Sequence, residues 1–461
     1  MTINASIAAN RFGLGARPGE LRAIGSDAQG FLLQQITAPP PNPVQLANLP
    51  SSARVVETLI AARTQRREAK AEKDAKAVQG LGQRLRPIYL DQLSARYEIA
   101  TQTNASFRER LIHFWTNHFA VSADKVQVTG LAATLENEAI RPHVGGSFAE
   151  LLLAVESHPA MILYLDNQAS VGPNSQLAER ARRRPHAKQA KLGLNENLAR
   201  EILELHTLGV SGGYSQADVT TFAAALTGWS IGGGFGPIRE GAPGTFQFRE
   251  NAHEPGARTI LGKHYSEAGV AQPRAVLRDL ARHPATAEHI ATKLARHFIS
   301  DSPPQSAVDR LKHVFLNTEG DLASLYRELI TDPESISEQP LKFKTPHEYV
   351  VSILRVFDFT PPAQVLFSTL QSLGQRPYMP GSPAGWPDTA EHWDGPDALL
   401  KRIEWASAIS QRFSARAKPV EVAQAALGRT LTEYTQKAIG RAASSAQALT
   451  LLLASPEFQR R

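Results

Sequence analysis

Apolar residues recur every three or four positions along almost the whole chain, which is the spacing of amphipathic helices. In the first half this pattern predicts helices at residues 3–12, 27–36, 107–119, 129–141, 148–158, 195–208 and 215–227. In the second half it predicts helices at 272–283, 286–298, 306–315, 322–331, 346–357 and 362–373, with more helices from the loop at 374–395 up to residue 458. The pattern indicates an all-α protein in which residues 1–461 form one large, multi-helix globular domain.

Two segments depart from this pattern. Residues 51–76 and 80–101 are helical but rich in alanine, arginine, lysine and glutamate. Because helices with a narrow apolar face often project from a domain, we expect a charged helical arm at 51–104, then a core at 105–300 and a C-terminal helical lobe at 301–461. Residues 228–263 are rich in glycine and contain short alternating and β-branched runs, which predict one small β-hairpin near residues 244–262.

The composition narrows the classes of function. The chain contains no cysteine, which excludes disulfides, thiolate nucleophiles and cysteine-bound metals. The net charge of +6 is small for 461 residues. Six basic residues lie between positions 180 and 191, but no aromatic residues are interleaved with them, so we do not expect binding to nucleic acid.

The sequence also lacks membrane and export signals. No run approaches the roughly 18 apolar residues of a membrane span. Residues 1–11 lack the basic start and the long apolar stretch of a signal peptide. We therefore expect a cytoplasmic protein, although export together with a partner is compatible with the sequence.

The helix at 107–119 carries a histidine on its apolar face. With about 100° of rotation per residue, His118 lies about 20° from Phe107, inside the arc that also contains Leu111. His113 falls on the opposite flank, where we expect greater exposure. An inward-facing histidine is more often a hydrogen-bonded core residue than a catalyst or ligand, so His118 taken alone fits both roles.

The helix at 195–208 carries a carboxylate among its leucines. Glu201 lies about 40° from the centre of the apolar arc of this helix. Burial of an ionised carboxylate costs several kcal/mol unless a partner compensates. Glu201 therefore indicates either a structural ion pair or a functional site.

Glu201 belongs to a polar strip. Asn197, Glu201 and Glu204 follow i, i+4, i+7 spacing, and Arg200 can pair with Glu196 on the far side. In the functional interpretation the strip faces a cleft, and Glu201 is a general base, a general acid or a metal ligand. In the structural interpretation it is an ion-paired brace between helices, and the sequence leaves both open.

A metal site is a further alternative. Glu201, Glu204, His206, His118 and His253 are residue types that could supply ligands together, but their spacing does not require it. The Glu-x-x-His motif at residues 250–253 lies in the glycine-rich segment rather than on a helix. We therefore predict no metal ligand, and the sequence indicates no particular cofactor.

Two loops add polar character. Residues 253–258 bring His253 and Arg258 around a turn that is suited to an anion or a sugar hydroxyl, or that is simply capped. Residues 385–393 contain Trp386 and Asp388. Trp386 could stack on a ligand, or the loop could pack on the body of the protein. The chain has no Gly-x-Ser-x-Gly elbow and no P-loop.

Several segments together resemble a known family. They are Arg11–Arg17, His113–Phe119, Asn195–Glu201, Leu226–Trp229, Leu341–Pro346, Gly385–Pro387 and Ser455–Gln459. On these segments, and over essentially the whole chain, the sequence resembles the bacterial family catalogued as domain of unknown function 1800. The resemblance places the family's signature on His118, Asn195, Glu196, Asn197, Arg200, Glu201, Glu204, His253 and Trp386.

The sequence departs from the family pattern in two segments, and the resemblance also implies a protein partner. The family's His-Asp-x-Gly-x-Lys turn is similar to residues 253–258 here, with Glu254 and Arg258 in place of the aspartate and the lysine. Residues 176–192 look like an insertion. Family members are often encoded beside a second family, numbered 1501, that looks like an exported sulfatase or phosphatase relative, which implies a protein partner of that kind.

We therefore hypothesise an enzyme for acid–base hydrolysis or elimination on a polar, carbohydrate-like or anionic small molecule or glycan. Its cleft would lie between the helices at 107–119 and 195–208, with Glu201 and His118 as catalytic residues. The substrate-binding residues would be Asn197, Arg200, Glu204, His206, His253, Arg258 and Trp386. The alternatives are a non-catalytic helical scaffold or accessory subunit that docks through the 51–104 arm, and a metal–carboxylate protein.

Overall fold

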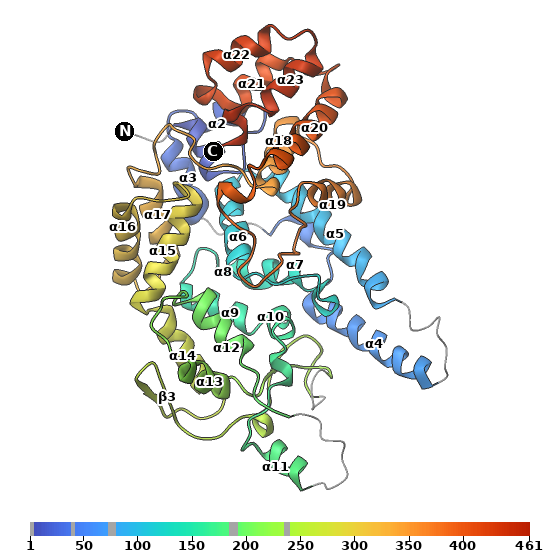
Figure 1. The fold of residues 1–461 in the computed structure, drawn as a ribbon, viewed down its shortest axis with the longest axis vertical. Coiled ribbons are helices and arrows are strands. Elements are labelled where there is room, and N and C mark those ends of the chain that lie inside the picture. Colours follow the sequence, from blue (N-terminus) through green and yellow to red (C-terminus); the bar gives the residue numbers. More distant parts are fainter. Residues whose placement is uncertain (1–3, 38–41, 72–79, 184–191, 235–239) are drawn as a thin grey trace.

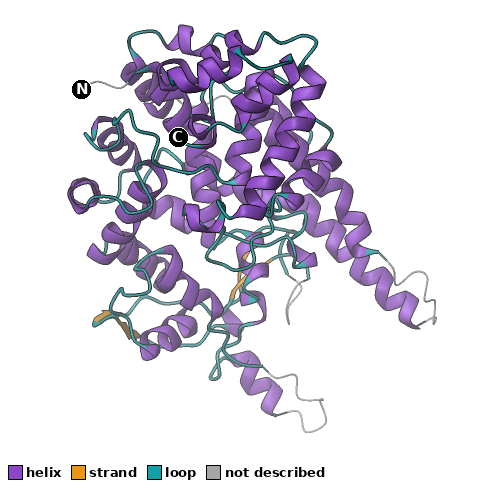
Figure 2. Cartoon of the chain, turned by 45° about the horizontal axis from the view of Figure 1, so that its top comes forward, coloured by secondary structure: helices purple, strands orange, loops and turns teal. Residues whose placement is uncertain are grey.

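The computed structural model describes residues 4–37, 42–71, 80–183, 192–234 and 240–461, without the side chains of residues 66–71. Helices make up most of the described chain, and its strands form two small antiparallel pairs (Figure 2). The predicted all-α class is therefore confirmed. Part of the charged arm, residues 72–79, and most of the basic segment, residues 184–191, lie outside the described residues.

Helix α6 (Ser106–His118) lies at the centre of the molecule (Figure 1). It packs on α3 (Ala28–Thr37) and on the wide helical turns at 8–12 and 135–140. Its side chains are buried on every side, including His113, which is 8% exposed. His113 is more exposed than His118, which is 1% exposed, as expected, but both are buried because α6 is enclosed on all sides.

The helices around α6 form the main core. The first part of the chain contributes α1 (Ala5–Ile7), α2 (Glu20–Ile24), α4 (Ser52–Ala71), α5 (Leu81–Gln102), α7 (Ala132–Thr134) and α8 (Arg141–His143). The lower part in Figure 1 contains α9 (Phe148–Glu156), α10 (Pro159–Tyr164), α11 (Gln176–Arg182), α12 (Asn197–Glu201), α13 (Gln216–Ala225) and α14 (Ala271–Ala281). On the left lie α15 (Pro284–Phe298), α16 (Gln305–Asn317) and α17 (Leu322–Thr331), which pack on one another and, through α17, on α3.

Helix α18 (Pro346–Phe357) connects the main core to a second hydrophobic cluster. Its Val350 and Leu354 belong to the main core, whereas Tyr349 and Ile353 belong to the second cluster. The second cluster is completed at the top of Figure 1 by α20 (Pro396–Phe413), α21 (Pro419–Leu427), α22 (Glu433–Gly440), α23 (Ser445–Leu453) and α24 (Pro456–Gln459). Helix α19 (Ala363–Ser372) packs beside α5 and precedes a long loop at residues 374–395.

The β-structure lies close to its predicted position but forms two ladders. Strand β1 (Trp229–Ile231) pairs with β2 (Phe246–Phe248), and β3 (Arg258–Ile260) pairs with β4 (Lys263–Tyr265) across a tight turn. The small β excursion is confirmed. The two runs that suggested one hairpin, at 245–248 and 258–261, each pair with a different neighbour.

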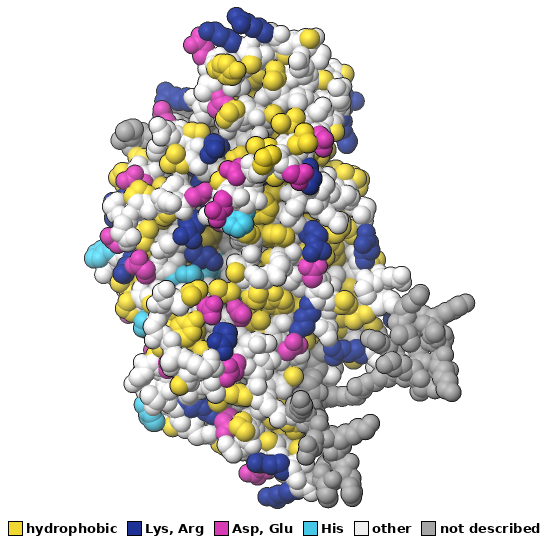
Figure 3. All heavy atoms as spheres, viewed as in Figure 1, with side chains coloured by type: hydrophobic (Ala, Val, Ile, Leu, Met, Phe, Trp, Pro, Cys, Tyr) yellow, Lys and Arg dark blue, Asp and Glu magenta, His cyan; other side chains and the backbone are white. Residues whose placement is uncertain are grey.

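The charged arm is formed by α4 and the beginning of α5, which extend away from the body at the right of Figure 1. Positive and negative side chains are interspersed over the face seen in Figure 3, without a large area of one sign. No helix in the described ranges is both long and apolar enough to span a membrane.

Three helical segments contain wide π-type turns, at Ala8–Phe12, Leu135–Ile140 and Ile202–His206. A π turn closes i→i+5 hydrogen bonds, so it rotates each residue by less than the 100° of an α-helix. The predicted helix at 195–208 is therefore α12 followed by a π turn. From residue 202 onwards, the directions of the side chains therefore depart from those of a regular helical wheel.

Candidate functional site

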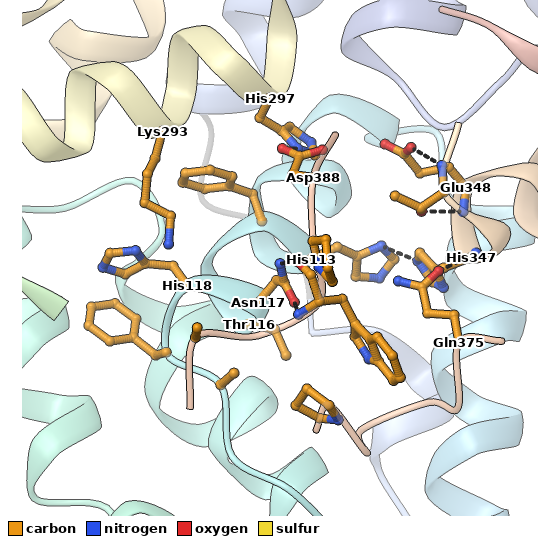
Figure 4. A pocket seen from close by; sticks show the side chains of 18 of the residues that line it. His113, Thr116, Asn117, His118, Lys293, His297, His347, Glu348, Gln375 and Asp388 are labelled. Atoms are coloured by element: carbon orange, nitrogen blue, oxygen red, sulfur yellow. Dashed lines mark hydrogen bonds and ion pairs between the residues drawn. The ribbon is translucent and has the colours of Figure 1, made fainter. Parts of the chain in front are cut away.

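A cavity of about 450 Å³ lies between α6, α15, the first turn of α18 and the loop at 374–395. A volume of this size accommodates a small molecule. Figure 4 shows that its labelled side chains approach one another from these different elements. We therefore regard it as the candidate functional site.

Helix α15 supplies one polar wall. His289, Lys293, Arg296 and His297 follow i, i+4, i+7, i+8 spacing and line the cavity. That spacing places them on one face, while the buried face, with Ile290 and Leu294, packs into the core. Pro284 begins the helix at a position where its missing N–H costs nothing.

Lys293 is a lysine with no polar partner in the described part of the chain. Its side chain forms no hydrogen bond or ion pair with any described residue, and it points towards His118 in Figure 4. Burial lowers the pKa of Lys293 to about 8, against the opposing effect of Asp388 and with a smaller contribution from Arg296. Lys293 therefore loses and gains a proton close to neutral pH.

His297 and Asp388 form a hydrogen-bonded pair. The Nδ1 atom of His297 lies 2.8 Å from Oδ2 of Asp388. Burial raises the pKa of the Asp388 carboxyl, but His297 and Lys342 outweigh it, so that pKa lies below its usual value. Because an ionised carboxylate only accepts, His297 donates through Nδ1 and has a lone pair on Nε2. That nitrogen has no hydrogen-bond partner among the described residues.

Asp388 is itself held in place. Lys342, which is almost fully buried, binds the Asp301 carboxylate and the Asp388 backbone carbonyl, and its Nζ lies 3.5 Å from Oδ1 of Asp388. The pairing orders the loop and fixes the carboxylate against His297. A carboxylate that orients an imidazole in this way is the usual support of a general base.

His118 is buried, with 1% of its surface exposed, and lines the cavity. Its Nε2 donates to the backbone carbonyl of His206 at 3.1 Å, so Nδ1 carries a lone pair that has no partner among the described residues. Burial lowers the pKa of His118 well below its usual value, and the charge of Lys293 lowers it further. His118 is therefore neutral near pH 7.

A chain of hydrogen bonds forms the opposite wall. The hydroxyl of Tyr97 lies 2.6 Å from Nδ1 of His347, and Nε2 of His347 lies 3.1 Å from Nδ1 of His113. The Nε2 atom of His113 lies 3.5 Å from Glu109, whose two carboxylate oxygens accept from Arg141 at 2.6 and 2.8 Å. At that distance His113 Nε2 has no hydrogen-bond partner among the described residues, so the hydrogen-bonded chain runs from Tyr97 through His347 to His113.

The loop that carries Asp388 is clamped to α6. The side chain of Asn117 donates to the Trp386 carbonyl at 2.9 Å and accepts from the Trp386 N–H at 2.8 Å. Gly385 has φ +82°, and a Cβ atom there would lie 2.3 Å from the Asn117 carbonyl oxygen. Only glycine tolerates both the backbone conformation and this close approach.

The structure brings His118 and Trp386 to the cavity, but Glu201 does not line it. Glu201 is half-buried, and burial raises its pKa. Its charged neighbours are His206, Glu204, Arg200 and Glu156. The structure does not bring Glu201 and His118 together in this cavity; Leu205, in the π turn that follows Glu201, lines it instead.

The other predicted residues on this helix also lie outside the cavity. Asn197 is exposed, and Arg200 pairs with Glu196 at 3.0 Å. Glu204 accepts from the Tyr214 hydroxyl at 3.1 Å. His206 is fully buried, with Nδ1 2.7 Å from the carboxylate of Glu156 on α9.

The turn at 253–258 is likewise remote from the cavity lining. His253 donates from Nδ1 to the Thr227 carbonyl at 2.9 Å. Arg258 donates to the backbone carbonyls of Gly256 and Glu254 at 2.6 and 2.5 Å and binds the Gln272 side chain. The guanidinium of Arg258 therefore holds the turn together.

The polar wall on α15 was not among the predicted site residues. The predicted helix at 286–298 contains Lys293, Arg296 and His297, and their spacing with His289 would have revealed a polar strip on a helix with an apolar opposite face. The partnership of His297 with Asp388 had no local signal, since 91 positions separate them.

The positions of the histidine and carboxylate side chains bear on the metal-site alternative. Within the described ranges, no group of three or more histidine, aspartate or glutamate side chains is arranged to hold a metal ion. The histidines of the cavity wall are instead engaged with carbonyls, carboxylates and one another.

Comparisons with known proteins address the family alone. No curated protein and no solved structure matches the chain. The model of the family described as "Protein of unknown function (DUF1800)" matches residues 7–460. This match covers nearly the whole sequence, as the resemblance indicated, and the chain therefore belongs to the DUF1800 family.

Proposed function

We propose that the protein is an enzyme that performs acid–base hydrolysis or elimination on a small polar molecule bound in the cavity beside α6 and α15. The observation that carries this proposal is the His297–Asp388 pair, joined at 2.8 Å in the wall of a cavity of about 450 Å³. An imidazole oriented by a carboxylate, with its second nitrogen unoccupied, is suited to removing a proton.

His297 is the proposed general base. In a hydrolysis, its Nε2 takes a proton from water while the water oxygen bonds to the electrophilic centre and the bond to the leaving group breaks. In an elimination, it takes the proton from carbon as the leaving group departs. Asp388 stabilises the imidazolium that forms in either reaction.

Lys293 is the proposed proton donor. With a pKa of about 8 it is mostly protonated at pH 7, yet it releases a proton far more readily than an exposed lysine. Its proton passes to the leaving group. Lys293 points towards His118, whose Nδ1 has no hydrogen-bond partner among the described residues, so both groups face the bound molecule from the same side of the cavity.

In this proposal His297 and Lys293 take the acid–base role that was expected of Glu201, and Asp388 supports His297. His118 and Trp386 keep a role because both line the cavity. A half-exposed tryptophan in the wall offers a flat apolar surface to a sugar or another ring.

The experiment compares small-molecule consumption by the wild type, His297→Gln and Asp388→Asn. Each purified protein is incubated with a cell extract freed of macromolecules, and compounds that disappear or appear are identified by mass spectrometry. His392→Gln is the matched control, because His392 is an exposed histidine in the same loop.

We expect the wild type and His392→Gln to convert the same compound. His297→Gln should lose about 10²–10⁴-fold in rate, the usual contribution of a general base. Asp388→Asn should also be strongly impaired. Equal conversion by the wild type and His297→Gln, with both proteins folded, would refute the proposal, as would the absence of any conversion by the wild type.

A further inference from the structure

The cavity wall carries more positive than negative charge. The charged residues that line it are four cations, Arg96, Arg110, Lys293 and Arg296, and two anions, Glu348 and Asp388, a difference of +2. This excess concerns the wall itself, since the surface in Figure 3 is mixed in sign.

Ion pairs account for all but two of these charges. Arg96 lies 3.1 Å from Glu136, Arg110 binds Glu348, and Asp388 is paired with Lys342. Lys293 and Arg296 form no ion pair with any described residue. These are the two positive charges of the wall that no ion pair within the described ranges neutralises, although the charge of Asp388 acts on Lys293 without contact.

Lys293 and Arg296 lie one helical turn apart on the same face of α15. Each is only partly exposed, and the Nε–H of Arg296 is buried without an acceptor. The groups around Lys293 are the charged Arg296 and Asp388 and the histidines His289 and His118, whose pKa values burial lowers. Asp388 is the acid among them and is already held by His297 and Lys342. Two adjacent cations in these surroundings repel each other unless a bound anion compensates them.

The rest of the wall is largely apolar. Leu14, Phe114, Phe119, Val121 and Leu205 line the cavity together with Trp386. A free inorganic ion would leave this surface without contacts, whereas a molecule with an apolar or ring-shaped body would cover it.

We propose that the substrate is a small organic anion whose carboxylate, phosphate or sulfate group is bound by Arg296, with the charge of Lys293 adding to the attraction. This inference rests on the proposed function, in which the cavity is the substrate site. Arg296 is a suitable ligand, because its planar guanidinium donates two parallel hydrogen bonds to such a group. Lys293 then lies beside the bound anion, within the same wall as the base.

The test uses the amine of Lys293 as a reporter. The full-length protein is labelled with acetic anhydride at pH 8, and the modification of Lys293 is measured by peptide mass spectrometry. Benzoate, phenyl phosphate and phenyl sulfate are added in separate experiments. Acetate, inorganic phosphate and inorganic sulfate serve as the matching anions without an aromatic ring. A bound anion keeps Lys293 protonated and slows its acetylation.

We expect at least one aromatic anion to slow the acetylation of Lys293 at least about fivefold. It should do so at a lower concentration than the matching anion without an aromatic ring. The anion that protects best identifies the head group. Arg296→Gln should raise the concentration for half-protection about tenfold or more. Arg296→Lys should retain part of the protection. Arg327→Gln, an exposed arginine on α17, is the matched control and should behave as the wild type.

Three results would overturn the inference. They are no protection of Lys293 by any anion, equal protection by the anions without an aromatic ring, or protection in a folded Arg296→Gln variant at the same concentrations as in the wild type. His297→Gln separates this inference from the proposed function. If the variant loses turnover but keeps protection, both stand. If it keeps the turnover of the wild type and protection is also kept, the assigned base is wrong while the anion site stands.

Discussion

Replacing Lys293 by methionine should make the protein more stable at neutral pH. The side chain lies in a cavity wall and forms no ion pair with any described residue. Burial lowers its pKa from 10.5 to about 8, which means that the folded state resists the protonated form. Methionine has a similar length and no charge, so it removes this cost while filling the same space.

The size of the effect follows from the pKa. A difference of about 2.5 between the folded and unfolded states corresponds to about 3 kcal/mol at 1.36 kcal/mol per unit. Partial exposure of the side chain relieves some of that cost, so we expect a gain of about 1–3 kcal/mol at pH 7. Between pH 8 and 10.5 the unfolded chain binds more protons at Lys293 than the folded protein does, so the wild type gains stability as the pH rises. The advantage of the variant should disappear over the same interval.

Urea unfolding of the wild type and Lys293→Met at several pH values from 7 to 10.5 measures this difference. Lys344 is buried and its pKa is lowered to about 7, but it is present in both proteins and cancels in the comparison. Lys418→Met, at a lysine whose side chain is 77% exposed, should change stability by less than about 0.5 kcal/mol. Two results would contradict this reasoning: a Lys293→Met variant less stable than the wild type at pH 7, or a gain in stability at pH 10.5 as large as that at pH 7. Either would show that another group neutralises the charge of Lys293 in the folded protein.

Three further outcomes are expected. Glu109→Gln leaves the buried Arg141 guanidinium without its carboxylate and should cost about 3–5 kcal/mol in urea unfolding, unlike a change at an exposed glutamate. Gly385→Ala forces the loop away from the Asn117 carbonyl and should cost about 1–3 kcal/mol and reduce turnover; an unchanged crystal structure of this variant would contradict the clamp. Glu201→Gln should leave turnover intact. Burial raises the pKa of Glu201, so the wild type should lose stability relative to this variant as the pH rises through that pKa, as unfolding at pH 4 to 8 would measure.

The fold was largely predictable because its signal is local. The apolar spacing of residues 322–331 and 346–357 matches α17 and α18 residue for residue, and most other helices differ by one to three residues at their ends. The errors in the predicted helices and strands have two causes. Regular rotation does not anticipate the π turns at 135–140 and 202–206, and residue patterns alone do not decide which strand pairs with which.

The site was only partly predictable. His118 was found because a polar residue interrupts an apolar arc, but Glu201 met the same criterion and lies elsewhere. The criterion detects burial, and burial is shared by structural and functional groups. Lys293 and Arg296 were recognisable in principle from their spacing on one helix. The role of Asp388 emerges only when the fold places its loop against α15.

The clamp between Asn117 and Trp386 joins residues 269 positions apart. During synthesis on the ribosome, α6 and α15 emerge well before the loop at 374–395, so the imidazole of His297 waits for its carboxylate until most of the chain has been made. A nascent chain arrested before residue 388 should consequently be inert towards any substrate, however well its earlier helices have folded. Pairing of His297 with Asp388 is thus a late event in the maturation of this chain.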